Sequence, residues 1–354
     1  MKKYGFLLFL FQTLLVNAQS PAKREKLLEQ MTLAIDSGKY PGMHSILISK
    51  NGHLNYEQYF NGFNRDSLHD SRSAFKSVTS LLTGIALDKG FLKSVHQKVY
   101  SFFPDYPSGK EAGFRQSMTI KNLLEMKSGF DCEEFNGTKD CEQAMETSKD
   151  WLKFSLGLPL KDRPGTVWSY TSINPMIISG IIHKASHIRV ADFAKKYLFG
   201  PLGIKKYRWS YDPSGNAMTG GSFFIRPVDM VKLGQLVLNE GKWEQRQLIS
   251  KKWLQESTKG NIPIPDFSFA KSSRSKMLLP QPTYYGYYWY HELLKTNAIE
   301  QDLLFASGNG GQYIFISRKL QLVVVFTQGN YGNWKAKQAF EILAKYILPG
   351  LTPE

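Results

Sequence analysis

Residues 73–84 read SAFKSVTSLLTG and carry the clearest periodic pattern of the chain. Large apolar residues recur at helical spacing in this stretch and at the position after it: Phe75, Val78, Leu82 and Ile85. The pattern predicts an amphipathic helix over 74–87 with Ser73 at its N-terminal end. Ser73 and Lys76 lie three positions apart and therefore share one face of this helix.

This spacing suits a nucleophile and its base. Lys76 can reach the Ser73 hydroxyl, and burial against apolar neighbours favours the neutral amine, which can accept a proton. The helix N-terminus adds free N–H groups and a positive dipole end. Ser-x-x-Lys also begins at Ser20, Ser268 and Ser273, but only Ser73 opens a strong helical pattern. The alternative is that Ser73 merely caps the helix.

The other periodic segments indicate an α/β fold. Helical patterns occupy 26–35, 74–87, 120–127, 149–156, 175–185, 190–198, 227–239, 251–257 and 334–346. Strand patterns occupy 44–50, 53–60, 284–290, 311–316 and 320–327, and Asn51-Gly52 predicts a hairpin between the first two. Strands at both ends with helices between them suggest one sheet built from both termini, with a helical lobe inserted.

The run over 73–82 resembles the serine β-lactamase-related superfamily, which includes class C β-lactamases, D-amino-acid peptidases, family VIII esterases and 6-aminohexanoate-dimer hydrolases. The segment PGTVWSYTS at 164–172 is similar to its second motif, Tyr-x-Asn. Tyr170 would then shuttle the proton between nucleophile and leaving group. The alternative is a core tyrosine. Ser172 replaces the usual asparagine, as it does in some esterase and 6-aminohexanoate hydrolase relatives.

The segment SGNGGQYIFI at 307–316 resembles the third motif and the strand that lines the site. The resemblance implies that the backbone N–H of Gln312 completes an oxyanion hole with that of the nucleophile. Gly310 and Gly311 would let a substrate approach the strand closely. Asn309 stands where β-lactamases carry lysine. The alternative is a plain turn before a strand.

The resemblance covers nearly the whole chain after its N-terminal segment, including 197–204, 219–222 and 226–227. It implies a β-lactamase/transpeptidase-like α/β fold, with an antiparallel sheet flanked by helices. We expect a single serine-hydrolase domain over 19–354. Its α/β lobe would comprise about 19–72 plus 284–354, and its helical lobe about 73–283.

Family resemblance and site residues together predict a serine hydrolase that cleaves a small ester or amide. The missing cation at Asn309 argues against carboxylate-bearing substrates, unless another residue such as Arg226 supplies it. A β-lactamase or D-amino-acid peptidase stays an alternative. A catalytically inactive cell-wall peptide-binding protein is a second one, because fold does not fix function.

Residues 1–18 have the pattern of a secretory signal peptide. Lys2 and Lys3 precede an apolar run from Tyr4 to Val16, and cleavage is expected after Ala18. The run is shorter than the roughly 20 residues that cross a bilayer. We therefore expect a periplasmic or secreted protein without stable membrane insertion after cleavage.

Charge, motifs and cysteines limit the possible partners and cofactors. The net charge is +15, but the lysines are scattered and no nucleic-acid module is recognisable, so we expect no nucleic-acid partner. We expect no metal or cofactor, since the zinc motif His-Glu-x-x-His and a dinucleotide loop are both absent. Cys132 and Cys141 form either a disulfide or two free thiols, because spacing alone does not give their separation.

Overall fold

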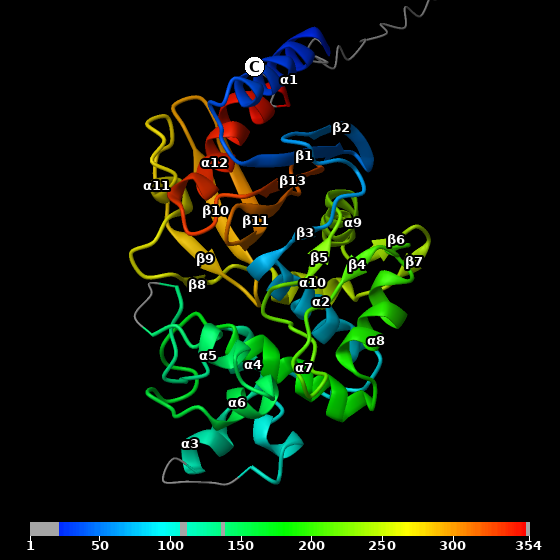
Figure 1. The fold of residues 1–354 in the computed structure, drawn as a ribbon, viewed down its shortest axis with the longest axis vertical. Coiled ribbons are helices and arrows are strands. Elements are labelled where there is room, and N and C mark those ends of the chain that lie inside the picture. The colour runs from blue at the N-terminus through cyan, green and yellow to red at the C-terminus, as the bar shows by residue number, and fades with distance from the viewer. Residues whose placement is uncertain (1–20, 107–111, 136–138, 352–354) are drawn as a thin grey trace, which may run out of the picture.

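The computed structural model describes residues 21–106, 112–135 and 139–351. Its centre is an eight-stranded antiparallel sheet in the order β2-β1-β13-β12-β11-β10-β9-β8 (Figure 1). The strands are β1 (Met43–Lys50), β2 (His53–Tyr59), β8 (Ile262–Pro263), β9 (Thr283–Tyr285), β10 (Tyr290–Lys295), β11 (Glu300–Gly308), β12 (Gln312–Ser317) and β13 (Leu322–Gln328). The N-terminal hairpin pairs with the last strand, so the predicted sheet from both termini is confirmed.

The predicted hairpin is formed by β1 and β2. Asn51 and Gly52 both have positive φ, 52° and 81°, which a tight hairpin turn of this kind requires. Two small sheets accompany the main one: β3 (His69–Asp70), β5 (Phe224–Ile225) and β4 (Tyr207–Arg208) form the first, and β6 (Lys242–Trp243) and β7 (Arg246–Gln247) the second.

Helices cover both faces of the large sheet and form a separate layer below it in Figure 1. Their bounds are α1 (Pro21–Asp36), α2 (Phe75–Asp88), α3 (Ala112–Ser117), α4 (Ile120–Leu124), α5 (Glu142–Glu146), α6 (Trp151–Gly157), α7 (Ile173–Ser186), α8 (Val190–Ala194), α9 (Pro227–Leu238), α10 (Lys251–Ser257), α11 (Phe269–Ser272) and α12 (Gln338–Ile342). Two π-helical turns, Lys195–Phe199 and Leu343–Ile347, continue α8 and α12.

Neighbouring residues of β12 explain why its whole length is buried. Successive side chains of a strand point to opposite faces. Ile314 packs against Gly234 of α9, where a Cβ atom would lie only 2.8 Å from it. Phe315 meets Phe340 of α12 on the other face, with ring centroids 5.0 Å apart. A strand covered on both sides becomes a continuous apolar run.

The structure corrects the strand predicted over 284–290. The chain forms β9 and β10 instead, with a turn between them in which Tyr288 has a φ of 65°. Gly286 enters this turn so close to Ser257 that a Cβ atom would lie 2.4 Å from its carbonyl oxygen. Aromatic composition indicated burial correctly but concealed the turn. The helix predicted over 120–127 is also shorter, since it ends at Leu124.

Cys132 and Cys141 are joined by a disulfide with a Cα–Cα separation of 5.8 Å, which decides between the two expectations. The predicted signal peptide at 1–18 lies outside the described residues. Within 21–351, and apart from 107–111 and 136–138, no helix is both long and apolar enough to span a membrane.

Candidate active site

Ser73 lies in a 3₁₀ turn, Arg72–Ala74, that leads directly into α2. The residue at the N-cap of α2 is Ala74, and no side chain caps this end, so Ser73 is not a capping serine. The turn is held by Ser71, whose backbone N–H and hydroxyl both donate to the carbonyl of Phe223. This leaves the half-buried Ser73 hydroxyl available for chemistry.

The Lys76 amine is enclosed, with 1% of the residue exposed. Its Nζ lies 3.0 Å from Oγ of Ser73, 2.9 Å from Oγ of Ser172 and 2.6 Å from the carbonyl oxygen of Gly220. A carbonyl only accepts hydrogen bonds, and a hydroxyl can accept one. A neutral amine that donates to Gly220 and Ser172 therefore keeps its lone pair for the proton of Ser73.

Two opposing effects act on the protonation of Lys76. Burial away from water lowers its pKa, and this is the largest effect. The nearby carboxylates of Glu134 and Glu142 act in the opposite direction, because negative charge favours the ammonium form. Lys76 is thus a buried amine with acidic neighbours, the kind of environment that tunes a general base.

Tyr170 lies against both residues. Its ring centroid is 4.8 Å from Nζ of Lys76, and the side chains of Ser73 and Tyr290 lie close enough to influence the pKa of its hydroxyl. Burial is the main reason that the pKa of Tyr170 is raised. The phenol therefore stays protonated and can donate to a leaving group next to Ser73.

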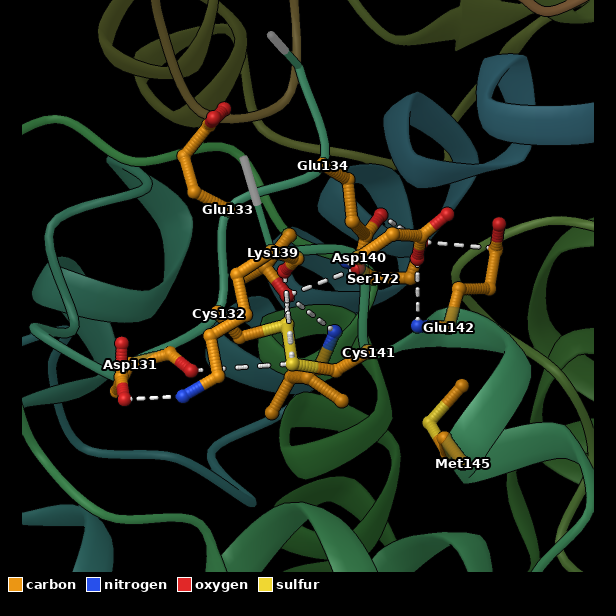
Figure 2. The surroundings of a disulfide bond; sticks show 12 residues. Asp131, Cys132, Glu133, Glu134, Lys139, Asp140, Cys141, Glu142, Met145 and Ser172 are labelled. Atoms are coloured by element: carbon orange, nitrogen blue, oxygen red, sulfur yellow. Dashed lines mark hydrogen bonds and ion pairs between the residues drawn. A yellow bond between two sulfur atoms is a disulfide. The ribbon is translucent and has the colours of Figure 1, made fainter. Parts of the chain in front are cut away.

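Ser172 is surrounded by charged groups (Figure 2). Besides its contact with Lys76, its Oγ lies 2.8 Å from Oε2 of Glu134 and 2.9 Å from Oε1 of Glu142. The Glu134 carboxylate also accepts from the backbone N–H of Ser172, at 2.7 Å, and from the Thr171 hydroxyl, at 3.0 Å. Glu134 therefore holds the segment that carries Tyr170 as well as the residue that contacts Lys76.

The third motif runs beside the nucleophile turn. A Cβ atom on Gly308 would lie 2.3 Å from the carbonyl oxygen of Ser71, so only glycine permits this approach. Gly310 and Gly311 have φ of 85° and 98°. The Gln312 side chain points into the protein and donates to the Gln328 carbonyl. The role of the Gln312 backbone N–H as an oxyanion-hole donor stays a prediction.

Asn309 is exposed, and its Oδ1 accepts from the backbone N–H of Gly332 at 2.9 Å. Arg226 binds Asp229 and Asp66 through its guanidinium, so its charge is compensated there. The cation beside the nucleophile is instead Arg72, which pairs with Asp70 at 2.8 Å.

Sequence reasoning missed Glu134, Glu142, Tyr290 and Arg72. The two glutamates lie next to Cys132 and Cys141 in sequence, which was the available signal. The other Ser-x-x-Lys serines have structural roles where they are described. Ser268 caps α11 and donates to Glu292, and Ser273 donates to the carbonyl of Ala270.

Residues 25–346 match the Beta-lactamase family. The chain therefore belongs to this family, whose members on this fold are serine hydrolases. A comparison with curated proteins finds no match.

Solved structures share the fold at low identity. The hydrolase EstCE1, described as having promiscuous acyltransferase activity, is 14% identical with a TM-score of 0.72 over 92% of this chain and 99% of its own. A family VIII carboxylesterase is 16% identical, with a TM-score of 0.69 over 92% and 97%. The octameric penicillin-binding protein homologue of Pyrococcus abyssi is 18% identical, with a TM-score of 0.70 over 93% and 78%.

Proposed function

We propose that the chain is an exported serine hydrolase that cleaves an ester or amide through an acyl-enzyme on Ser73. The observation that carries the proposal is the contact of 3.0 Å between the buried Lys76 amine and the Ser73 hydroxyl. A buried amine within hydrogen-bonding distance of a serine hydroxyl is the arrangement that activates a serine nucleophile.

In the first half-reaction Lys76 takes the proton of Ser73 while Oγ attacks the substrate carbonyl carbon. The tetrahedral oxyanion is stabilised by the backbone N–H groups of Ser73 and Gln312. Tyr170 donates a proton to the leaving group as the bond to it breaks, and recovers one from Lys76. Water then attacks the acyl-enzyme by the same route in reverse, which releases the acid and restores Ser73.

The substrate proposed is uncharged near the scissile bond. Asn309 supplies an amide where a lysine would grip a carboxylate, and a neutral donor makes roughly half as strong a bond as a charged one. Arg72 is already paired with Asp70, and the acidic side chains of Glu134, Glu142 and Asp140 lie near Lys76. These charges favour short esters and neutral amides over penicillins and carboxylate-terminated peptides.

A fluorophosphonate probe tests the nucleophile. Intact mass should show one adduct on the wild type, and peptide mapping should place it on Ser73. Ser73→Ala should abolish the adduct. The matched control Ser268→Ala removes another Ser-x-x-Lys serine and should label normally. An adduct on another serine, such as Ser268 or Ser273, would overturn the assignment of Ser73. A folded protein that binds cell-wall peptides and takes no adduct would favour the binding-protein alternative.

Export is proposed from residues 1–18 alone, whose basic start and short apolar run are typical of a signal peptide. Expression of the full chain in a Gram-negative host should give a periplasmic protein that begins at Gln19. Recovery of the uncleaved chain from the cytoplasm would contradict this assignment.

A further inference from the structure

We propose that Glu134 and Glu142 share one proton across the Ser172 hydroxyl, and that the single negative charge left on the pair sets the basicity of Lys76. The proposal rests on the serine-hydrolase function above and assigns both glutamates as positioning residues of that site. Neither touches the reacting Ser73 in the described contacts.

The first step is a count of protons at Ser172. A serine hydroxyl has one proton to donate and two lone pairs that accept. Ser172 Oγ accepts from Lys76 and lies within 2.9 Å of an oxygen of each glutamate. It can donate to only one of them. The other contact becomes a hydrogen bond only if that carboxyl carries a proton and donates it to Ser172.

The second step concerns burial. Two carboxylates around one hydroxyl repel each other, and the cost grows where water is excluded. Burial raises the pKa of Glu134 to about 7, against the usual 4.5, and the charge of Glu142 adds to this rise. Glu134 therefore holds its proton into the neutral range, and the hydrogen bonds through the Ser172 hydroxyl connect that proton to both carboxyl groups.

The third step connects the pair to Lys76. A lysine buried without a counter-charge falls to a pKa of roughly 5–6, which makes it a weak base. Each carboxylate nearby restores part of its basicity, so two charged glutamates would favour the ammonium form more than one does. A pair that carries one shared proton places one negative charge beside Lys76, in addition to the smaller effect of Asp140. Burial and these charges oppose each other, which is how a general base is tuned.

Other charged groups around the pair lie on the elements packed against it. They are Asp70 in β3, Arg72 in the nucleophile turn, Asp140 before α5, Glu146 in α5 and Tyr170 before α7. Among the described residues none of these contacts Ser172 Oγ, so the proton count above concerns only Lys76 and the two glutamates. The disulfide between Cys132 and Cys141 fixes both glutamates, since each lies within two residues of a bridged cysteine (Figure 2).

Lysine titration by NMR tests the proposal without requiring turnover. Protein labelled with ¹³C at the lysine ε-carbon is titrated, and the Lys76 signal is assigned by its loss in Lys76→Ala. The variants are Glu134→Gln, Glu142→Gln and the double variant. A glutamine amide can accept from the Ser172 N–H and donate to its hydroxyl, so it imitates the protonated carboxyl.

We expect the Lys76 midpoint to fall by about one pH unit or more in the double variant, the size typical of losing a nearby opposite charge. Each single variant keeps one carboxylate and should shift much less, so that the double shift exceeds the sum of the singles. If the two single-variant shifts of the Lys76 midpoint simply added up to the double-variant shift, the proposal of a shared proton would be overturned. An unchanged midpoint in the double variant would overturn the action on Lys76.

A titration of the glutamate δ-carbons in the wild type tests the shared proton even if the double variant does not fold. One proton of the Glu134–Glu142 pair should persist into the neutral range, whereas release of both below about pH 5 would overturn the proposal. The rate of phosphonylation at Ser73 should follow the Lys76 midpoint in every variant. If the NMR result holds but Ser73 never reacts, the proposed function fails while the shared proton stands.

Discussion

The Nζ atom of Lys76 lies 2.6 Å from the carbonyl oxygen of Gly220, its shortest polar contact in the site. Gly220 comes this close because it has no side chain, since a Cβ atom there would lie 2.9 Å from Cβ of Ser172. The carbonyl fixes one N–H of the amine. It thereby turns the rest of the amine toward the two serines, and its direction is set before substrate arrives.

Loss of Lys76 or of the Tyr170 hydroxyl should lower kcat while leaving the fold intact. A positioned acid–base group contributes about 10²–10⁴ in rate. Lys76→Ala and Tyr170→Phe should each lose that much in steady-state hydrolysis of a short ester. The double variant should lose less than the product of the two, because the groups act as a unit. Near-wild-type turnover in Tyr170→Phe would make this tyrosine structural.

The disulfide should support both stability and activity. Closing a loop of this length stabilises a protein by about 2–3 kcal/mol in the chain-entropy treatment. Cys132→Ser/Cys141→Ser should therefore lower the urea midpoint. It should also lower kcat/KM, because Glu134 and Glu142 lose their fixed positions beside Ser172. The matched control Asp131→Asn removes the ion pair with Lys139 in the same loop. If Asp131→Asn lost as much activity as the double cysteine variant, the loss could not be attributed to the disulfide.

The sequence predicted the parts of this site that depend on local spacing. The helix after Ser73 follows from periodicity, and the hairpin at Asn51-Gly52 follows from turn chemistry. The second and third motifs were identified by their resemblance to the family. The carboxylates did not, because Glu134 and Ser172 are far apart in sequence and only the fold brings them together. The turn inside 284–290 was missed for a related reason: its aromatic residues are buried by tertiary packing, whatever their local conformation.

Glu134 should make stability depend on pH. Its pKa is about 7 in the folded protein against 4.5 as the usual value, so folding favours the protonated form. The stabilisation is complete below about pH 4.5 and is lost as the pH rises through 7. Glu134→Gln does not titrate there. Relative to wild type, the variant should therefore gain stability between pH 5 and pH 8 in urea denaturation.

Glu133→Gln is the control for this titration, because Figure 2 shows Glu133 pointing away from Ser172. Its stability should follow that of the wild type across the same range. If Glu134→Gln ran parallel to wild type as well, the carboxyl would be titrating normally in the folded protein.

Gly84 tests whether the small residues of α2 serve packing rather than catalysis. A Cβ atom there would lie 2.1 Å from the ring of Trp253, whose indole N–H donates to the Ser80 carbonyl. Gly84→Ala should destabilise by about 1–3 kcal/mol through overpacking, although alanine is the better helix former. Gly157→Ala in α6 meets open space and is the matched control. Equal melting temperatures in the two variants would contradict this packing.

Substrate choice should depend on the charge at position 309. Asn309→Lys places a cation on the exposed rim, where it can pair with a substrate carboxylate. The variant should lower KM for cephalosporins and carboxylate-terminated peptides with little change in kcat, since the carboxylate is bound equally in ground and transition states. The variant Arg72→Gln tests the role of the other cation beside the nucleophile. Hydrolysis of neutral esters by this variant should be nearly unchanged, because Arg72 is already paired with Asp70. Efficient cephalosporin hydrolysis by the wild type that disappears in Arg72→Gln would instead identify Arg72 as the carboxylate-binding cation.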